Sequence, residues 1–225
     1  MTYVLSDVHG EYDLFSALLK SISFSSNDVM YICGDVIDKG RSPARLAALI
    51  SKYPNVKVIL GNHEYEFLKY YHSLMSQDSD IESVMRSLRE YFVDGEYLDW
   101  DTVDWIESLP SYIETDSCIF VHAGVPCNEK RELLPLSSVS EEELLYDRRF
   151  KDKSFTHASP KCVFFGHTET SAITGKDEII AYLRHGAKAP YSIRDFYKIH
   201  LDTGAWSRGT LGCFCIENCM VYYVK

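Results

Sequence analysis

Residues 3–9 read YVLSDVH, an apolar run that leads directly into two potential metal ligands, Asp7 and His9. Further apolar runs end in the same way, at Asp35, at the triplet Asn62–Glu64, at His122 and at His167. Buried strands read as continuous apolar runs, and in open α/β sheets ligands collect just beyond the strand ends. The repeated pattern therefore predicts a metalloenzyme whose site is assembled at the ends of several strands.

The rest of the chain alternates helix and strand patterns. Amphipathic helices are predicted at about 11–22, 43–52, 64–75, 81–93 and 102–108. Strands are predicted at about 3–6, 28–33, 56–60, 111–115, 118–121, 161–165, 198–202, 211–216 and 219–224. Residues 175–190 are ambiguous between helix and loop, and 128–158 form a charged insertion. With 225 residues and no internal repeat, we expect one α/β domain over 1–225.

Composition narrows the class of protein. The chain has 46% hydrophobic and 25% charged residues, as a globular protein does, and a formal net charge of −10. That charge argues against nucleic acid or an anionic membrane as partner, because both need clustered Lys and Arg. No apolar run approaches the roughly 18 residues of a membrane span, and no cleavable leader is evident, so we expect a cytoplasmic protein. The seven cysteines read as reduced, structural thiols.

The spacing at each junction suggests its chemistry. Asp7 and His9 sit at i and i+2 on extended backbone, so both side chains point the same way and can hold one ion. Asp35 follows a glycine at a strand end and can bridge two ions with its two oxygens. Asn62 offers a neutral amide oxygen. His63 faces another direction, which leaves it free for proton chemistry.

Five ordered motifs carry a resemblance that spans nearly the whole chain: Asp7–His9, Gly34–Gly40, Gly61–Glu64, His122–Gly124 and Gly166–Thr168. They resemble, in order, the motifs of the phosphoprotein phosphatase family of binuclear metallophosphoesterases, especially the short bacterial and lambda-phage-type serine/threonine phosphatases. Leu201–Ala205 also resembles a segment that follows the last ligand in bacterial members. The resemblance implies a calcineurin-like α/β fold, a central β-sandwich of mixed sheets flanked by helices.

The resemblance also implies roles. Two divalent ions would be held by Asp7, His9 and Asp35 on one side and by Asp35, Asn62, His122 and His167 on the other. A hydroxide bridging the ions would attack phosphorus directly, without a covalent phosphoenzyme. His63 would protonate the leaving group, oriented by Asp38. Arg148 matches the phosphate clamp of the family's Trp-x-Arg pattern, with Tyr146 in place of Trp.

One departure from the family pattern concerns phosphate binding. Lys39 stands where most members have Arg, and it supplies a point charge but no planar fork. Arg41 lies two residues further along and is a second candidate. We expect Arg41→Ala to weaken substrate binding more than Lys39→Ala does.

Several residues also have ordinary structural interpretations. Asp202 reads as a turn former before Gly204, Glu64 as a helix-start carboxylate that supports the ligands, and Ser140 as a helix N-cap. His72, His157, His185 and His200 read as core or surface histidines. Arg149 is not separable from Arg148 by spacing alone.

The leading functional hypothesis is a protein phosphatase acting on phosphoserine or phosphothreonine, and possibly on phosphotyrosine, with a phosphorylated protein or peptide as partner. The alternative is a symmetrical bis(5'-nucleosyl)-tetraphosphatase, and an inactive phosphopeptide-binding protein is a third hypothesis. By resemblance the metal is expected to be manganese, with iron or zinc as alternatives. Specificity is expected to reside in the 76–104 helices and the 128–158 insertion.

Overall fold

A computed structural model describes residues 1–76, 80–92 and 98–225. The N-terminal part alternates β1 (Thr2–Leu5), α1 (Tyr12–Ser21), β2 (Val29–Ile32), α2 (Pro43–Ile50), β3 (Val56–Val58) and α3 (Asn62–Met75). β1 pairs in parallel with β2, and β2 with β3. The C-terminal hairpin, β9 (Leu211–Cys215) and β10 (Val221–Val224), completes this sheet in the order β10-β9-β1-β2-β3.

A second sheet, in the order β4-β5-β6-β8-β7, is built from later residues. Its strands are β4 (Tyr112–Glu114), β5 (Cys118–Val121), β6 (Cys162–Phe165), β7 (Ile180–Leu183) and β8 (Phe196–His200). Short helices α6 (Glu141–Tyr146), α7 (Ser171–Thr174) and α8 (Ala205–Arg208), with 3-10 turns at Leu136–Ser138 and Ile193–Asp195, lie in the connections. Both sheets mix parallel and antiparallel pairs.

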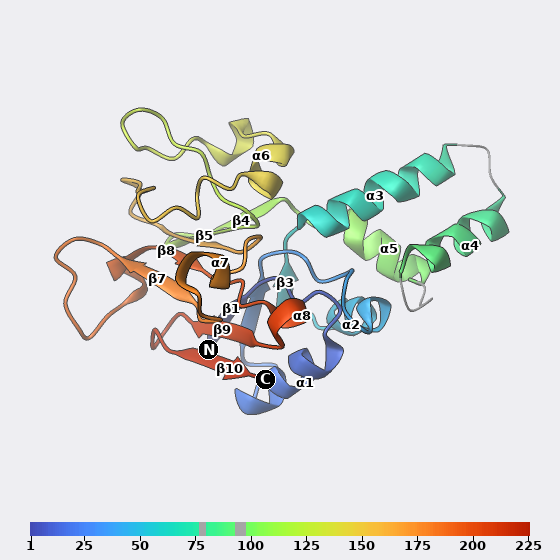
Figure 1. The fold of residues 1–225 in the computed structure, drawn as a ribbon, viewed down its shortest axis with the longest axis horizontal. Helices are drawn as coiled ribbons and strands as arrows, with labels where there is room; N and C mark the ends of the chain where they lie inside the picture. Colours follow the sequence, from blue (N-terminus) through green and yellow to red (C-terminus); the bar gives the residue numbers. More distant parts are fainter. Residues whose placement is uncertain (77–79, 93–97) are drawn as a thin grey trace.

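The two sheets pack face to face. Side chains from both, including Val4, Phe214, Phe120 and Phe164, form a shared apolar core, and the Tyr31 and Phe120 rings stack at 4.0 Å. A second core lies between the first sheet and its helices. The predicted fold, a β-sandwich of mixed sheets flanked by helices, is confirmed (Figure 1).

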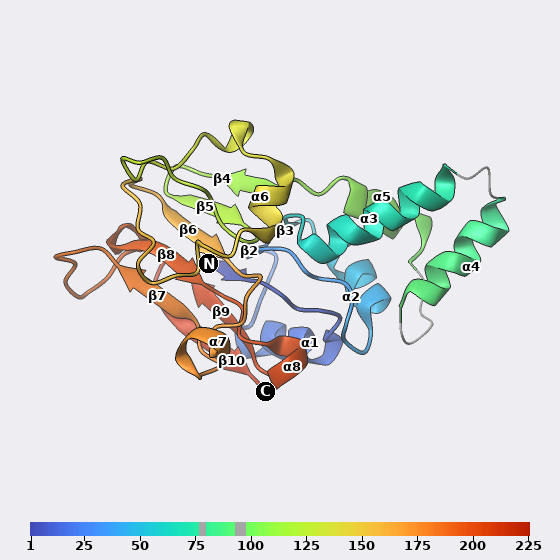
Figure 2. The same cartoon turned by 45° about the horizontal axis from the view of Figure 1, so that its top comes forward.

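Three helices extend from one side of the sandwich. α3, α4 (Ile81–Tyr91) and α5 (Trp100–Glu107) project away from the sheets in both views (Figures 1 and 2). Tyr71 is buried, and the partly buried Tyr70 ring stacks on Tyr91 at 5.4 Å, so both tyrosines pack with the core beneath these helices. Helix α4 ends at Tyr91, and the predicted end at Val93 lies outside the described residues.

The ambiguous segment 175–190 contains an antiparallel strand, β7, which pairs with β8. Its residues are apolar in sequence, but a run this short cannot be assigned to strand or helix from periodicity alone. Cys213 and Cys215 face one core, whereas Cys219 packs against the other. Among the described residues, no helix is both long and apolar enough to cross a membrane.

A buried lysine fixes the segment that follows Arg148. Lys198 is completely buried, and its Nζ donates to the carbonyls of Phe150, Asp152 and Phe155 at 2.7, 2.8 and 2.9 Å. Burial lowers the pKa of Lys198 to about 8. The three hydrogen bonds compensate for burying the ammonium group and hold residues 150–155 against β8.

Lys198→Met should therefore lower the free energy of unfolding by about 2–4 kcal/mol, because one buried and two partly buried carbonyls lose their donor. Denaturant titration measures the effect. Lys188→Met, at an exposed lysine, is the matched control and should change it by less than about 0.5 kcal/mol. An equally small change in Lys198→Met would show that these bonds contribute nothing net.

Candidate metal centre

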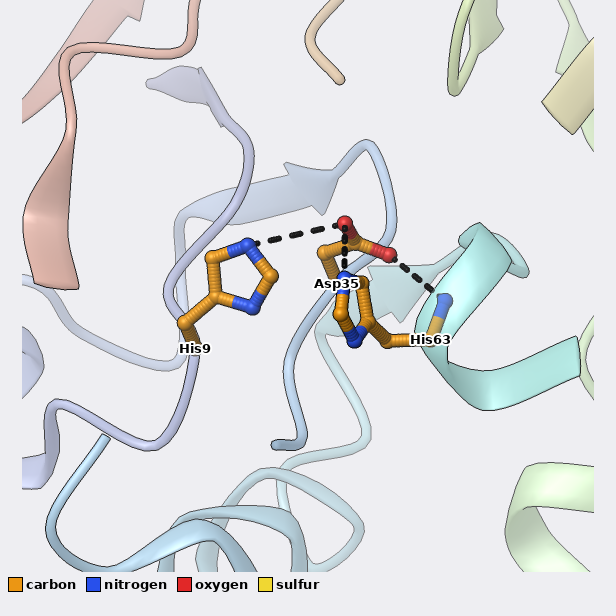
Figure 3. Close-up of side chains that lie close together, drawn as sticks. All are labelled: His9, Asp35 and His63. Atoms are coloured by element: carbon orange, nitrogen blue, oxygen red, sulfur yellow. Dashed lines mark hydrogen bonds and ion pairs between the residues drawn. The ribbon is translucent and has the colours of Figure 1, made fainter. Parts of the chain in front are cut away.

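Loops at strand ends bring the motif residues together. Asp7 and His9 follow β1, Asp35 follows β2, and His63 begins α3 after β3. Figure 3 shows His9, Asp35 and His63 pointing toward one another. Six residues of these motifs adopt left-handed backbone conformations: Asp7, His9, Asp35, Asp38, Lys39 and His167, with φ of 51°, 47°, 55°, 71°, 61° and 68°. Such strain clusters at functional sites, where surrounding structure holds it in place.

Asp35 lies at the centre of the cluster. Its Oδ2 is 3.4 Å from His122 Nε2, 3.6 Å from His9 Nε2 and 3.9 Å from His63 Nε2. Burial opposes a charge on Asp35, but His122, His9 and His63 together hold its pKa below the usual range. Potential ligand atoms of His9, Asp35 and His63, and of Asp7, Asp35 and His122, lie within 4.8 Å of one another in each set.

On the other side of Asp35, the lone pairs of His122 Nε2 and Asn62 Oδ1 face each other with no proton on either atom. His122 Nδ1 donates to the carbonyl of Cys33 at 2.8 Å, so in the neutral ring Nε2 carries a lone pair. That nitrogen lies 2.9 Å from Asn62 Oδ1, and His167 Nδ1 lies 2.9 Å from the same oxygen. Two lone pairs at this distance repel unless a cation lies between them. The donor set therefore fits a metal ion.

Burial shifts the pKa values of these histidines and carboxylates in directions that favour binding of a cation. It lowers the pKa of His9 to about 4 and of His167 to about 3, which keeps both rings neutral, as ligands must be. Burial raises the pKa of Asp7 well above its usual range, and the charges of Asp202 and Asp35 raise it further. A bound cation would relieve this repulsion among buried carboxylates.

His63 differs from the other histidines. Its Nδ1 donates to Asp38 Oδ2 at 2.7 Å, and the ring is partly exposed. Burial opposes protonation, but the bond to Asp38 and the charge of Asp35 outweigh it and raise the pKa of His63 above its ordinary value. The arrangement brings together the pair that the sequence proposed as proton donor and orienting carboxylate.

Glu64 supports the loop that carries Asp35. It is completely buried, and its two oxygens accept backbone N–H groups of Asp35, Val36, Ile37 and Gly61 at 2.7–3.0 Å. The interpretation of Glu64 as a helix-start carboxylate that supports the ligands agrees with these contacts.

Glu64→Gln should destabilise the fold by about 2–4 kcal/mol, because an amide NH₂ cannot accept from the backbone donors that face it. Thermal unfolding of the metal-free protein measures the change. Glu82→Gln, at an exposed residue of helix α4, is the control and should leave the midpoint nearly unchanged. Equal midpoints for the two variants would contradict the role given to Glu64.

The structure distinguishes the arginines and the lysine near the cluster. Arg149 is paired with Asp147 at 2.8 Å, whereas the charge of Arg148 lowers the pKa of His167, so Arg148 is the arginine near the metal ligands. Lys39 Nζ lies 3.2 Å from His9 Nε2, where it donates to the ring lone pair.

Arg41 interacts electrostatically with an acid outside the metal-ligand cluster. It lies near Glu11, whose raised pKa it moderates. These contacts favour Lys39 over Arg41, so we now expect Lys39→Ala to raise KM more than Arg41→Ala, the reverse of the ranking expected from sequence. Steady-state kinetics of the two variants checks this, and a larger effect of Arg41→Ala would restore the first ranking.

Two further features were not assigned to the site from sequence. Asp202 bonds its own turn, accepting from Gly204 N at 3.0 Å as predicted, but it is also buried and electrostatically coupled to Asp7. A small cavity of about 90 Å³ beside His9 and His167 is lined by Asp202 and Trp206. The resemblance of Leu201–Ala205 to a bacterial segment is the sequence signal from which this turn could have been placed near the site.

The calcineurin-like phosphoesterase family matches residues 2–188, and the chain belongs to this family. It is therefore a hydrolase of the metallophosphoesterase class, and family membership implies divalent metal ions, for which the cluster described above offers candidate ligands. The family match does not establish the phage-type serine/threonine phosphatase subgroup.

Curated relatives share one name. A symmetrical bis(5'-nucleosyl)-tetraphosphatase of Buchnera aphidicola subsp. Baizongia pistaciae is 30% identical over 128 residues, covering 55% of this chain and 44% of that protein. Its counterpart in Wigglesworthia glossinidia brevipalpis is 28% identical over 149 residues, covering 63% of this chain and 52% of that protein. The matched stretch is thus about half the length of each relative.

Solved structures confirm the fold. A protein provisionally assigned as a diadenosine tetraphosphatase superposes with a TM-score of 0.70 at 18% identity, covering 99% of this chain and 92% of its own. A cold-active protein-tyrosine phosphatase of a psychrophilic Shewanella species superposes with a TM-score of 0.64 at 15% identity, covering 99% of this chain and 76% of its own. At these identities the likeness concerns the fold alone.

The leading hypothesis from sequence, a protein phosphatase with a phosphorylated protein or peptide as substrate, is wrong. The curated relatives are consistently named as symmetrical dinucleoside tetraphosphatases, which act on a small dinucleotide. The error has a physical cause: the motifs hold metals and a phosphoryl group, which both substrate classes share, and they do not contact what is attached to the phosphate.

Proposed function

We propose that this protein hydrolyses dinucleoside tetraphosphates symmetrically, converting each into two nucleoside diphosphates. The observation that carries the proposal is the shared activity named for its curated relatives. The buried cluster around Asp35 supports it, because it gathers metal ligands, a candidate proton donor and a nearby arginine in one place.

The cluster would hold two divalent ions, which we propose to be Mn²⁺, through Asp7, His9, Asp35, Asn62, His122 and His167. When bound, such ions polarise phosphoryl oxygens and activate water. Asp35 would hold both ions, since its carboxylate lies between the two groups of histidines. Iron and zinc remain the alternatives for the same ligands.

The remaining residues act on the substrate. Arg148 and Lys39 would bind the negatively charged oxygens of the phosphate chain. His63, oriented by Asp38, would give its Nε2 proton to the oxygen that leaves with the departing nucleoside diphosphate. Asp38 acts as a positioning residue, because it contacts the ring and not the substrate.

Metal removal and product analysis test the proposal. Protein dialysed against a chelator should be inactive, and Mn²⁺ should restore release of ADP as the sole nucleotide product from diadenosine tetraphosphate. His122→Asn should stay inactive after Mn²⁺ is added, whereas His185→Asn, at an exposed histidine, should match wild type. AMP and ATP as products, or no nucleotide product, would contradict symmetrical hydrolysis.

A further inference from the structure

A groove with a volume of about 520 Å³ lies between α3 and α6. Tyr65, Glu66 and Lys69 line one wall, and Glu142 and Tyr146 line the other. We propose that this groove binds the purine base of one nucleoside of the substrate and so decides which phosphorus is attacked. The inference rests on the proposed function and extends it to substrate recognition.

One residue that lines the groove, Tyr146, lies beside the metal-ligand cluster. The Tyr146 ring lies 6.2 Å from the ring of His167, and Arg148 follows Tyr146 by two residues. On the opposite wall, Tyr65 follows His63 by two residues on α3. A phosphate chain bound at the cluster therefore has a path to the groove past Arg148 and His63.

Tyr146 offers a fixed aromatic surface within the groove. Its hydroxyl donates to Glu66 Oε1 at 2.6 Å, which ties α6 to α3 and holds the ring in place. The side chain is still 36% exposed. The Tyr65 ring meets it edge-on at 6.5 Å, and Lys69 Nζ lies 5.4 Å over the Tyr65 ring. Tyr146 is therefore the ring on which a base can stack.

Charge separates the groove from the phosphate site. The cations that line the groove are each paired with an acid, Lys69 with Glu66 at 3.2 Å and Arg149 with Asp147 at 2.8 Å. Glu142 adds a further exposed carboxylate. Such a lining repels polyphosphate but accepts hydrogen bonds from the exocyclic amino group of a purine. The groove thus suits a base and not a phosphate.

Binding the base here would set the position of attack. When one base is bound in the groove, one ribose and one phosphate lie between that base and the metal-ligand cluster. The phosphorus atom at the cluster is then the second of the four in the phosphate chain. Water forms a bond to that phosphorus, and the bond to the oxygen bridging the second and third phosphorus atoms breaks. The bridging oxygen keeps the electron pair and takes a proton from His63, while water loses a proton to solvent. The products are two nucleoside diphosphates.

Substitution of Tyr146 tests this inference. Tyr146→Leu removes the ring, and Tyr146→Phe keeps it without the hydroxyl. Tyr146→Leu should raise KM for diadenosine tetraphosphate about tenfold and should yield AMP and ATP beside ADP, because the chain slips along the cluster. Tyr146→Phe should yield ADP alone. Tyr191→Leu, at a similarly exposed tyrosine, is the matched control. Tyr65→Leu, from the opposite wall, provides a second variant if Tyr146→Leu fails to fold.

The outcomes separate this inference from the proposed function. A raised KM with mixed products supports the base subsite. Wild-type KM and ADP alone in Tyr146→Leu, or in Tyr65→Leu if that variant has to replace it, would overturn the subsite and leave symmetrical hydrolysis intact. Absence of ADP from the wild-type reaction would overturn the proposed function and, with it, a nucleotide subsite.

Discussion

Asp35→Asn is expected to lower turnover by more than about 10³-fold and to abolish binding of at least one metal ion. Removing residues that merely support a ligand costs 10–100-fold, and Asp35 contacts three histidines of the cluster directly. An asparagine keeps the shape but removes the charge that lies between two sets of ligands. Metal content of purified protein and ADP release measure the two effects.

The control for this prediction is Asp13→Asn, an exposed aspartate in the first turn of α1, which should keep wild-type metal content and turnover. Unfolding midpoints of the metal-free proteins show whether the Asp35 variant is folded. A folded Asp35→Asn protein that retains its full metal complement and wild-type turnover would remove Asp35 from the centre of the site.

His63→Asn is expected to lower turnover of diadenosine tetraphosphate about 10²-fold while leaving metal content unchanged. The loss should be larger for an alkyl phosphate, whose alkoxide leaving group needs a proton, than for p-nitrophenyl phosphate. Asp38→Asn should lose less, about tenfold, because it only orients the ring through the 2.7 Å contact.

Metal content is the decisive readout for His63, since this ring lies within reach of His9 and Asp35. Loss of metal in His63→Asn would make the residue a ligand, and equal losses on all substrates would count against its role as the acid. His185→Asn serves as the control for replacing an exposed histidine.

The fold could be predicted from the sequence because the apolar runs that form several strands lead directly into the ligand motifs. The runs before Asp35 and His122 are continuous and apolar, and they form β2 of the first sheet and β5 of the second. β7 was missed although Ile180–Leu183 are all apolar, because so short a run does not distinguish a strand from a helix. This edge strand is identified by its pairing with β8, which lies further along the chain.

The sequence named the residues of the candidate site but did not reveal the contacts among their side chains. Motif order placed Asp35, His63 and Asp38 together, but their contacts depend on left-handed loops and on the support of Glu64, which no spacing reveals. The substrate was predicted wrongly for a related reason. The groove beside Tyr146 forms only when α6, in the charged insertion, packs against α3. The expectation that specificity resides in the 128–158 insertion is consistent with that groove and stays a prediction.

Hydrolysis of diadenosine tetraphosphate in water enriched in ¹⁸O tests the central claim most directly. Direct attack of water on the second phosphorus predicts ADP as the sole nucleotide, with one ¹⁸O on the β-phosphate of half the molecules and none on any α-phosphate. The label should disappear from the nucleotides when the metal is removed by chelation, because turnover stops. Label in AMP, or AMP and ATP as the main products, would contradict symmetrical hydrolysis at this site.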